Sequence, residues 1–166
     1  MKRIVLLSDT HGHFDEKMIK YFDGCDEIWH AGDIGKIDVM DELAKHTPVL
    51  RAVHGNIDDG MIRREFKEKV RFAIEGFDVL ITHIGGKPYV YPKNIINDLN
   101  FNPPQIFVCG HSHILRVQYD KKRNFLYLNP GAIGVNGFHK VRTMLRFTLS
   151  RGEIKDMEAI ELGKRA

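Results

Sequence analysis

The chain has 166 residues and a formal net charge of +3, with 43% hydrophobic and 28% charged residues. This length and composition are ordinary for a globular protein with one substantial core. No apolar run approaches the ~20 residues that a membrane span needs, and the small net charge gives no indication of nucleic-acid binding. We therefore expect one domain, residues 1–166, with neither a membrane span nor a specific nucleic-acid partner.

The start of the chain and the cysteines bear on where the protein works. Met1 is followed almost at once by an apolar run, without the small-residue cleavage site of a signal peptide. Cys25 and Cys109 lie far apart and form no C-x-x-C pattern, so we expect free, reduced thiols. Together these features predict a cytoplasmic protein.

The predicted strands are runs rich in Val, Ile, Phe and Tyr that are bounded by Gly, Asn, Asp or Pro. Helices are predicted where apolar residues recur at helical spacing or follow a capping residue. Asp38 is expected to cap the second helix, and Pro92 to take the first position of the third. In chain order the elements are strand 3–8, helix 14–22, strand 27–31, helix 38–45, strands 49–53, 71–74 and 78–82, helix 92–98, and strands 106–109, 115–119, 125–128, 143–149 and 154–160.

The order of these elements predicts the fold class. Strands and helices alternate early in the chain, which is typical of a parallel α/β core. From Ile106 onward nearly every predicted element is a strand. Two mixed β-sheets packed face to face, with helices on the outside, satisfy both halves. We therefore expect a layered α/β sandwich.

Polar side chains follow five of these strands, at the point where each strand ends. Ligands gather outside the carboxyl ends of strands in open α/β sheets, so such residues can converge in space. Residues two apart in an extended chain point the same way, so we expect Asp9 and His11 to aim into one pocket. The same holds for His111 and His113. The full set is Asp9, His11, Asp33, Asn56, His83, His111 and His113.

This set offers oxygen and imidazole nitrogen but no thiolate. Such donors suit Mn²⁺, Fe²⁺, Co²⁺ or Zn²⁺ rather than an iron–sulfur cluster or a four-cysteine zinc site. The seven residues exceed what one tetrahedral ion takes, and a carboxylate can bridge two ions. We therefore predict a site for two divalent metal ions.

The motifs "SDTHG", "HAGD", "HGNID", "ITH", "CGHSH" and "NPG" occur in this order along the chain. This ordered set resembles the calcineurin-like metallophosphoesterases, and is most similar to their small single-domain branch, the YfcE-like phosphodiesterases. The similarity runs from Ile4 to Gly131. It implies a four-layer αββα sandwich, in agreement with the elements above.

The resemblance also implies how the metals are held. Asp9, His11, Asp33 and His113 correspond to the ligands of the first ion, with Asp33 bridging to the second. Asn56, His83 and His111 correspond to the remaining ligands of the second ion. The family uses two divalent ions per chain, with Mn²⁺ favoured and Fe²⁺, Co²⁺, Ni²⁺ or Zn²⁺ as alternatives.

The activity implied is hydrolysis of a small phosphodiester or nucleotide-like substrate by a hydroxide that bridges the two ions. The candidate catalytic residues are Asn56, whose amide can donate to a phosphate oxygen, His83, and Asp58, which is expected to orient His11 or another ligand. Many relatives carry a histidine at the position of Ile57, where it protonates the leaving group or steadies the phosphate. The small branch commonly lacks it and is associated with diesters. Some close relatives also carry a histidine where Gly85 stands.

Alternatives remain for several histidines and for the function. His30 is expected to be packed or to support a ligand, His13 and His54 are open candidates for phosphate contact, and His46 and His139 are expected at the surface. Some members of this fold, including the retromer scaffold subunit of eukaryotes, act mainly as protein-binding platforms. A catalytically weak scaffold is therefore the alternative function, and a metal-dependent regulatory module is a third. A homodimer is a further expectation.

Overall fold

The computed structural model describes all 166 residues and contains two five-stranded β-sheets. In both sheets parallel and antiparallel strand pairs occur together, so both are mixed. The first sheet has the order β10 (Glu153–Lys164), β9 (Val141–Ser150), β1 (Lys2–Leu7), β2 (Glu27–His30), β3 (Val49–Ala52). The second has the order β4 (Lys69–Ile74), β5 (Phe77–Thr82), β6 (Ile106–Val108), β8 (Phe125–Pro130), β7 (Leu115–Asp120).

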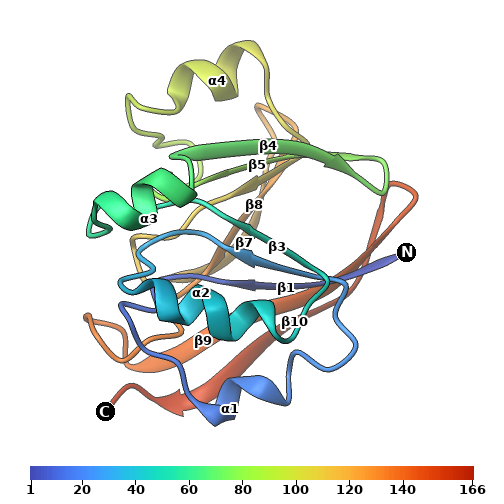
Figure 1. Cartoon of the computed structure of the whole chain (residues 1–166). Coiled ribbons are helices and arrows are strands. Elements are labelled where there is room, and N and C mark those ends of the chain that lie inside the picture. Colours follow the sequence, from blue (N-terminus) through green and yellow to red (C-terminus); the bar gives the residue numbers. More distant parts are fainter.

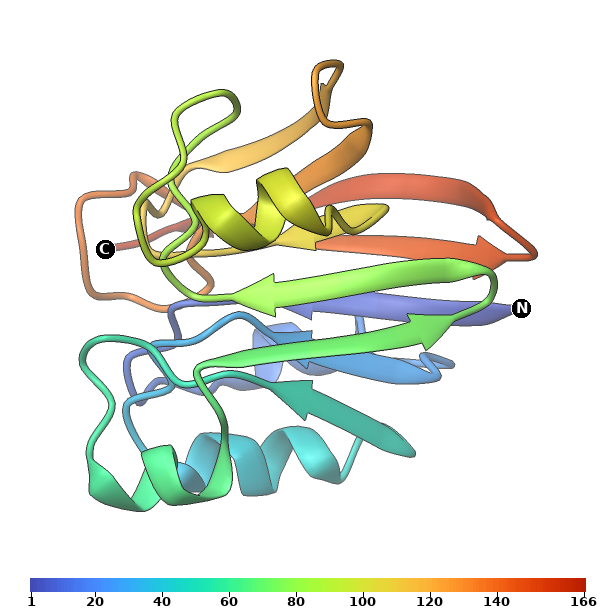
Figure 2. The same cartoon turned by 90° about the horizontal axis from the view of Figure 1, so that it is seen from above.

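Helices cover the outer face of each sheet. Side chains of α1 (Glu16–Ile19), α2 (Ile37–Ala44) and α3 (Gly60–Glu65) share one buried cluster with the first sheet. The loop before α4 (Ile96–Phe101) and the helix itself pack Ile95 and Leu99 against the second sheet. Figures 1 and 2 show α4 on one side of the molecule and α1 and α2 on the opposite side. The predicted αββα sandwich is confirmed.

The alternation of side chains in β1 shows how the layers are joined. Ile4 and Leu6 lie between the two sheets, against residues such as Ile81 of β5. Val5 and Leu7 point to the other face and pack under the helices. Because β1 is buried on both faces, the backbone at its carboxyl end has little freedom. The residues that follow this strand therefore start from a fixed position.

All ten predicted strands are present, and the differences lie at their ends. The largest concern the last hairpin, where β9 and β10 extend beyond the predicted 143–149 and 154–160. The added residues are mainly charged or polar, so the apolar pattern did not reveal them. The register between these strands shifts twice, between Lys155 and Glu158 and between Glu161 and Gly163.

The predicted helix boundaries were less accurate. The first helix, expected over 14–22, is confined to α1 because Asp15 caps it by accepting from the Lys17 amide at 3.1 Å. Asp38 does not cap α2: it lies inside the first turn, and the N-cap position is taken by Lys36, whose side chain makes no capping hydrogen bond. The expected helix 92–98 begins only at Ile96, because Pro92 opens a preceding turn and its carbonyl accepts from the Ile95 and Ile96 amides.

Helix α3 was not predicted. Its sequence is rich in charge and buries a single side chain, that of Ile62, so it shows no apolar periodicity. The signal that was present is Asp59, whose carboxylate accepts from the amides of Met61 and Ile62 at 3.2 and 3.4 Å. Among the four helices, none has the length and apolarity needed to cross a membrane. Both cysteines are free and buried.

Candidate metal centre

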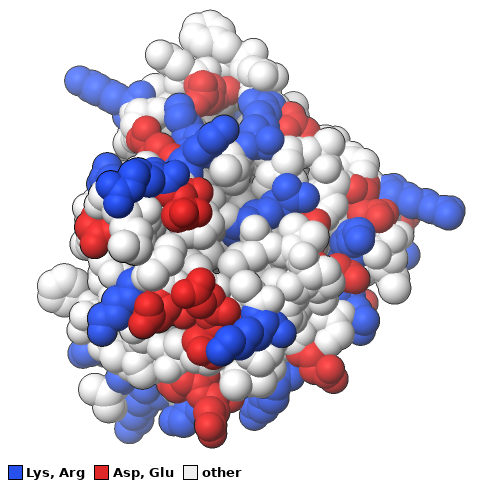
Figure 3. Space-filling model, in the orientation of Figure 1, with Lys and Arg blue, Asp and Glu red and all other residues white.

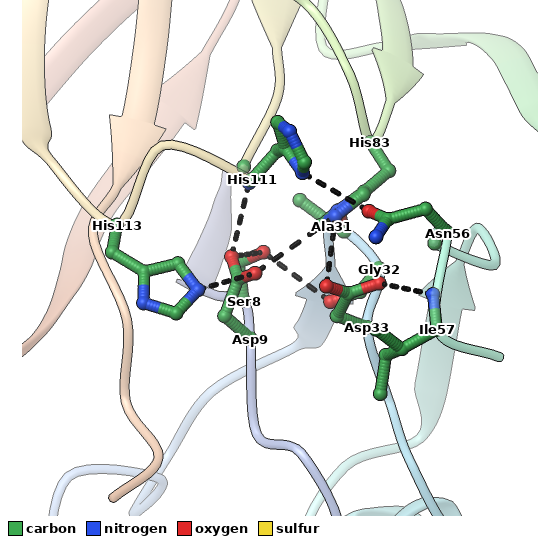
Figure 4. A network of polar contacts seen from close by, with 12 residues as sticks. Ser8, Asp9, Ala31, Gly32, Asp33, Asn56, Ile57, His83, His111 and His113 are labelled. Atoms are coloured by element: carbon green, nitrogen blue, oxygen red, sulfur yellow. Dashed lines mark hydrogen bonds and ion pairs between the residues drawn. The ribbon is translucent and has the colours of Figure 1, made fainter. Parts of the chain in front are cut away.

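Loops from both sheets meet at the carboxyl ends of their parallel strands, as Figure 4 shows at close range. The loops after β1, β2 and β3 bring Asp9, Asp33 and Asn56 from the first sheet. His83 follows β5, and His111 and His113 lie between β6 and β7 of the second sheet. The convergence of strand ends inferred from the sequence therefore occurs in the structure, across two sheets rather than one.

The backbone at these residues is left-handed rather than extended. Non-glycine residues rarely adopt a positive φ, yet five of the ten that do so in this chain belong to the candidate site. The values run from 46° at His11 to 69° at His111, and the full set is Asp9, His11, Asp33, His111 and His113. Such strain concentrates at functional sites and has to be held by the surrounding fold.

This geometry changes the pairing that was expected from residues two apart. Asp9 and His11 do face the same space, but His111 and His113 turn to different sides. The potential ligand atoms fall into two clusters, each within 4.8 Å: Asp9, His11 and His113 in one, and Asp33, His83 and His111 in the other.

The Asp9 carboxylate has one oxygen fixed and one oxygen free. Oδ2 accepts from the Ser8 hydroxyl at 2.6 Å and from the His111 amide at 3.2 Å. Oδ1 is buried without a hydrogen-bond partner, and the Nε2 atoms of three imidazoles surround it. They belong to His113 at 3.1 Å, His11 at 3.8 Å and His83 at 3.9 Å.

In Asp33, too, one carboxylate oxygen accepts a hydrogen bond from the chain and the other faces imidazoles, here from both clusters. Its Oδ1 accepts from the Ile57 amide at 3.1 Å. Its Oδ2 lies 3.2 Å from His83 Nε2 and 3.5 Å from His11 Nε2. Because these two histidines belong to different clusters, Oδ2 lies where one atom can reach both.

These atoms fit divalent cations. Asp9 Oδ1, His11 Nε2 and His83 Nε2 are buried and have no hydrogen-bond partner, which is costly unless another ligand is bound. His83 Nδ1 donates to the Ala31 carbonyl at 2.7 Å, so the lone pair of the neutral ring lies on Nε2, which faces Asp33. Carboxylate oxygens and neutral imidazoles are the donors that such ions take.

The charges at the site are consistent with this. Burial alone would raise the pKa of Asp9, but the nearby imidazoles of His11 and His113 lower it overall. The pKa of Asp33 is also lowered, because His83 offsets the effect of burial. The neighbouring Asp9 carboxylate raises the pKa of His11, and Asp33 raises that of His83 against the effect of burial. Both carboxylates are therefore anionic and attract cations.

Asn56 and Asp58 take different places. Asn56 is exposed, and its Oδ1 lies 3.0 Å from His111 Nδ1, which brings it to the second cluster. Asp58 is buried, and its contacts lie with the loop of another ligand, Asp33, rather than with His11. Its carboxylate accepts from the amides of Ile34, Gly35 and Gly55 at 3.1, 2.8 and 2.7 Å. It therefore fastens the loop that carries Asp33 to the loop that carries Asn56.

His139 was expected at the surface, but it is buried beside a candidate ligand. Its Nε2 donates to the Gly134 carbonyl at 2.8 Å, so Nδ1 of the neutral ring is an acceptor. His113 Nδ1 lies 3.1 Å away and donates to it, which leaves His113 Nε2 facing Asp9. A Cβ at Gly137 would collide with the His113 ring. In the sequence, the only hint of this role is that Gly137 lies two residues before His139. Such a pair is common and does not by itself indicate a functional histidine.

The other histidines do not belong to either cluster of candidate ligands. His30 is buried, contacts the Thr10 hydroxyl through Nε2 at 3.0 Å and accepts from the Gly32 amide, which is the supporting role expected. His13 pairs with Asp15 at 2.7 Å, and His54 Nδ1 donates to the Phe66 carbonyl. His46 is half-buried and stacks on Phe14 rather than lying free at the surface.

A family comparison decides where this chain belongs. The model for the calcineurin-like phosphoesterase superfamily domain matches residues 1–152. The chain is a member of this superfamily. The resemblance drawn from the motifs is thereby confirmed, and the two clusters of carboxylates and imidazoles suit the divalent metals of a metallophosphoesterase.

Individual relatives agree with this assignment. A probable metallophosphoesterase of Mycoplasma pneumoniae is 26% identical over 164 residues, which cover 95% of this chain and 96% of that protein. An archaeal phosphodiesterase of known structure matches with a TM-score of 0.76 and 19% identity, over 96% of this chain and 99% of the other. Vps29 of Entamoeba histolytica, solved in complex with Zn²⁺, matches with a TM-score of 0.69 and 16% identity, over 97% and 99%. At these identities the two structures show a shared fold.

One departure from other superfamily members has a structural reason. Gly85 stands where some relatives carry a histidine. A Cβ at Gly85 would lie 2.7 Å from Cys109 Sγ and 2.9 Å from the Phe107 ring, so no side chain fits on this backbone.

Burial raises the pKa of the Cys109 thiol to about 12, so this cysteine is a small buried apolar residue and not a ligand.

Proposed function

We propose that this chain is a metal-dependent phosphodiesterase that uses two divalent ions, with Mn²⁺ favoured. The observation that supports this best is the position of Asp33 Oδ2, within 3.5 Å of an imidazole nitrogen from each of the two clusters. A ligand that bridges two ions must have an anionic oxygen close to both sets of ligand atoms. Asp33 Oδ2 meets this requirement, because it lies near His11 Nε2 of one cluster and His83 Nε2 of the other.

The residues divide between the two ions in a simple way. Asp9, His11 and His113 would hold one ion, His83, His111 and Asn56 the other, and Asp33 both. When bound, such ions act as Lewis acids toward water and toward phosphoryl oxygens. The chain keeps each ligand in place through a second contact, such as His83 to the Ala31 carbonyl and His113 to His139.

Other side chains serve the substrate. His111 and Asn56 are exposed, so a phosphoryl group can approach the centre from this side. The Asn56 amide group can donate to a phosphoryl oxygen while its Oδ1 faces the metal side. Asp58 is not placed to touch substrate, and we assign it to positioning the loops of Asp33 and Asn56.

The residue at position 57 affects which phosphate esters the protein can hydrolyse well. Ile57 follows Asn56 directly, its amide donates to Asp33 Oδ1, and its 46% exposed side chain has no proton to give to a leaving oxygen. General acid catalysis typically contributes 10²–10⁴-fold, so without it poor alkoxide leaving groups react slowly. A diester with an aryl group needs less of this help. We therefore infer that aryl diesters are better substrates than alkyl monoesters.

The test compares two substrates and three proteins. Metal-free protein receives Mn²⁺, and kcat/KM is measured for bis(p-nitrophenyl) phosphate and for an alkyl phosphate monoester. The diester is expected to react faster, and Ile57→His should narrow the gap by up to roughly 10²-fold. Met61→His, at an exposed apolar residue of α3, is the matched control and should not change the ratio. A preference of the unmodified protein for alkyl monoesters would contradict the interpretation of Ile57.

The alternative function, a protein-binding platform on the same fold, makes a different prediction. In that case two ions bind but neither ester is hydrolysed. The complete ligand set favours catalysis. A role with nucleic acid has no support on the face shown in Figure 3, where basic and acidic side chains are interspersed. A homodimer and a cytoplasmic location stay predictions.

A further inference from the structure

A cavity of about 420 Å³ opens directly beside the candidate metal centre. It lies between β7 and the segment that leads from β5 to α4. Gly110 and His111 line it, so it is continuous with the site that would hold the phosphoryl group. Its size is within the range of about 300–1,000 Å³ that is usual for small-molecule sites. Its apolar walls come from Ile84, Val90, Tyr91, Ile114 and Tyr127.

The walls of this cavity are fixed by hydrogen bonds. Tyr127 Oη donates to the Gly86 carbonyl at 2.6 Å, and Tyr91 Oη donates to Asp120 at 2.6 Å. The amide of Lys121 donates to Tyr89 Oη at 3.1 Å. The segment 86–91 is therefore held at both ends and in the middle. A ligand that enters does not have to order this segment, which favours affinity.

The charge in the cavity has one sign. Lys87 and Arg116 line it, and no aspartate or glutamate does. Neither side chain takes part in any ion pair or side-chain hydrogen bond of the structure. By contrast, the neighbouring Arg123 is paired with Asp120 at 3.3 Å. Two unpaired cations above apolar walls favour a ligand that combines an aromatic face with negative charge.

We propose that this cavity binds an aromatic, negatively charged substituent of the phosphoester whose phosphoryl group lies at the metal centre. The inference rests on the proposed function and adds the class of substrate. The ring would lie against the apolar wall formed by Val90, Tyr91 and Ile114, and its charged group would face Lys87 and Arg116.

The opposite side of the centre differs in chemistry. There a cavity of about 370 Å³ is lined mainly by polar and charged residues, among them His54, Arg63, Glu68 and Asn94. Asn56 and His83 connect this cavity to the centre, and Ile84 borders both cavities. An aromatic group would lose its contacts with apolar walls there. The two sides therefore give an asymmetric substrate one orientation, with its aromatic group beside His111.

The proposal is tested by binding of three inert phosphonates to the Mn²⁺-loaded protein, measured by calorimetry. Phenylphosphonate is expected to bind about 10-fold more tightly than methylphosphonate, because its ring is buried. 4-Carboxyphenylphosphonate should bind roughly 5-fold more tightly again at low salt, and this gain should shrink at high salt. Combined Lys87→Gln and Arg116→Gln changes should remove the gain from the carboxylate and leave the gain from the ring.

A matched pair of variants locates the ring. Ile114 and Val117 are both exposed, at 58% and 45%, but only Ile114 lines the cavity. Ile114→Ser should bring the affinities for phenyl- and methylphosphonate within about 3-fold, whereas Val117→Ser should leave the 10-fold ratio.

The outcomes separate this proposal from the proposed function. If methylphosphonate binds but phenylphosphonate binds no better, the cavity does not take the ring, and the proposed function stands. Equal effects of Ile114→Ser and Val117→Ser would also overturn the assignment of the cavity. If none of the phosphonates binds to the metal-loaded protein, this inference fails, whereas the proposed function fails only if the Mn²⁺-loaded protein does not hydrolyse bis(p-nitrophenyl) phosphate.

Discussion

His139 connects a candidate metal ligand to the backbone through two hydrogen bonds. If this contact orients His113, His139→Ala should weaken Mn²⁺ binding at one of two sites by about 10–100-fold. His139→Gln keeps an acceptor and should lose less. His46→Ala, a half-buried histidine outside the site, is the control and should bind as the unmodified protein does. Competition titration with a metal indicator measures these affinities, and equal affinities in all four proteins would show that His139 only fills space.

His30 makes the stability of the metal-free protein depend on pH. Burial lowers its pKa from 6.5 to about 4, so the folded protein keeps it neutral while the unfolded chain takes up a proton. Stability is therefore complete above pH 6.5 and is lost as the pH falls toward 4. Between pH 8 and pH 5 this residue should cost about 2 kcal/mol of unfolding free energy.

The measurement is urea unfolding of the metal-free protein at both pH values, compared with His30→Gln. His11 and His83 have raised pKa values and act in the opposite direction, but they are the same in both proteins. The difference between the proteins isolates His30. An identical pH dependence in the two would refute the role of its burial.

Residue types at the site were readable from the sequence, but their conformation was not. An acid or histidine directly after an apolar strand is a local signal, and all seven candidates come together in the structure. The left-handed backbone at Asp9 or His111 depends on contacts with distant loops, so it overrode the extended geometry assumed for residues two apart. His139 follows no strand end, and its role depends on a partner 26 residues away.

At the scale of elements, strands were predicted well and helices poorly. Runs of Val and Ile buried on both faces identify a strand regardless of its neighbours, as in β1 and β6. The helices are short, and their limits depend on single capping contacts such as those of Asp15 and Asp59. Periodicity has little power over four to eight residues, which is why α3 was missed and α4 was displaced.

Substitutions at two adjacent aspartates before α3 compare the stability supplied by a helix cap with that supplied by contacts between loops. Asp59 only caps the helix, so Asp59→Ala should lower the free energy of unfolding by about 1 kcal/mol. Asp58 accepts three backbone hydrogen bonds that join two loops, so Asp58→Ala should cost about 3 kcal/mol. Urea unfolding of the metal-free variants measures both. Equal losses would show that the Asp58 contacts do not hold the loops together.

At the scale of the molecule, the candidate site exists because the two sheets end at the same place. Asp9 and Asp33 come from the first sheet, whereas His83 and His111 come from the second. The buried cluster between the sheets, which includes Leu6 and Ile81, fixes their relative position. That the chain is one cooperative domain stays a prediction, and this shared cluster is the reason to expect it.

The most direct test of the account is the number of metal ions that the protein binds. Metal-free protein is reconstituted with Mn²⁺, freed of excess ion by gel filtration and subjected to elemental analysis. We expect two ions per chain, a loss of both in Asp33→Ala because its carboxylate is shared, and two ions in Asp41→Ala, a control at an exposed position of α2. No more than one ion per chain in the unmodified protein, or two tightly held ions in Asp33→Ala, would contradict the dinuclear centre.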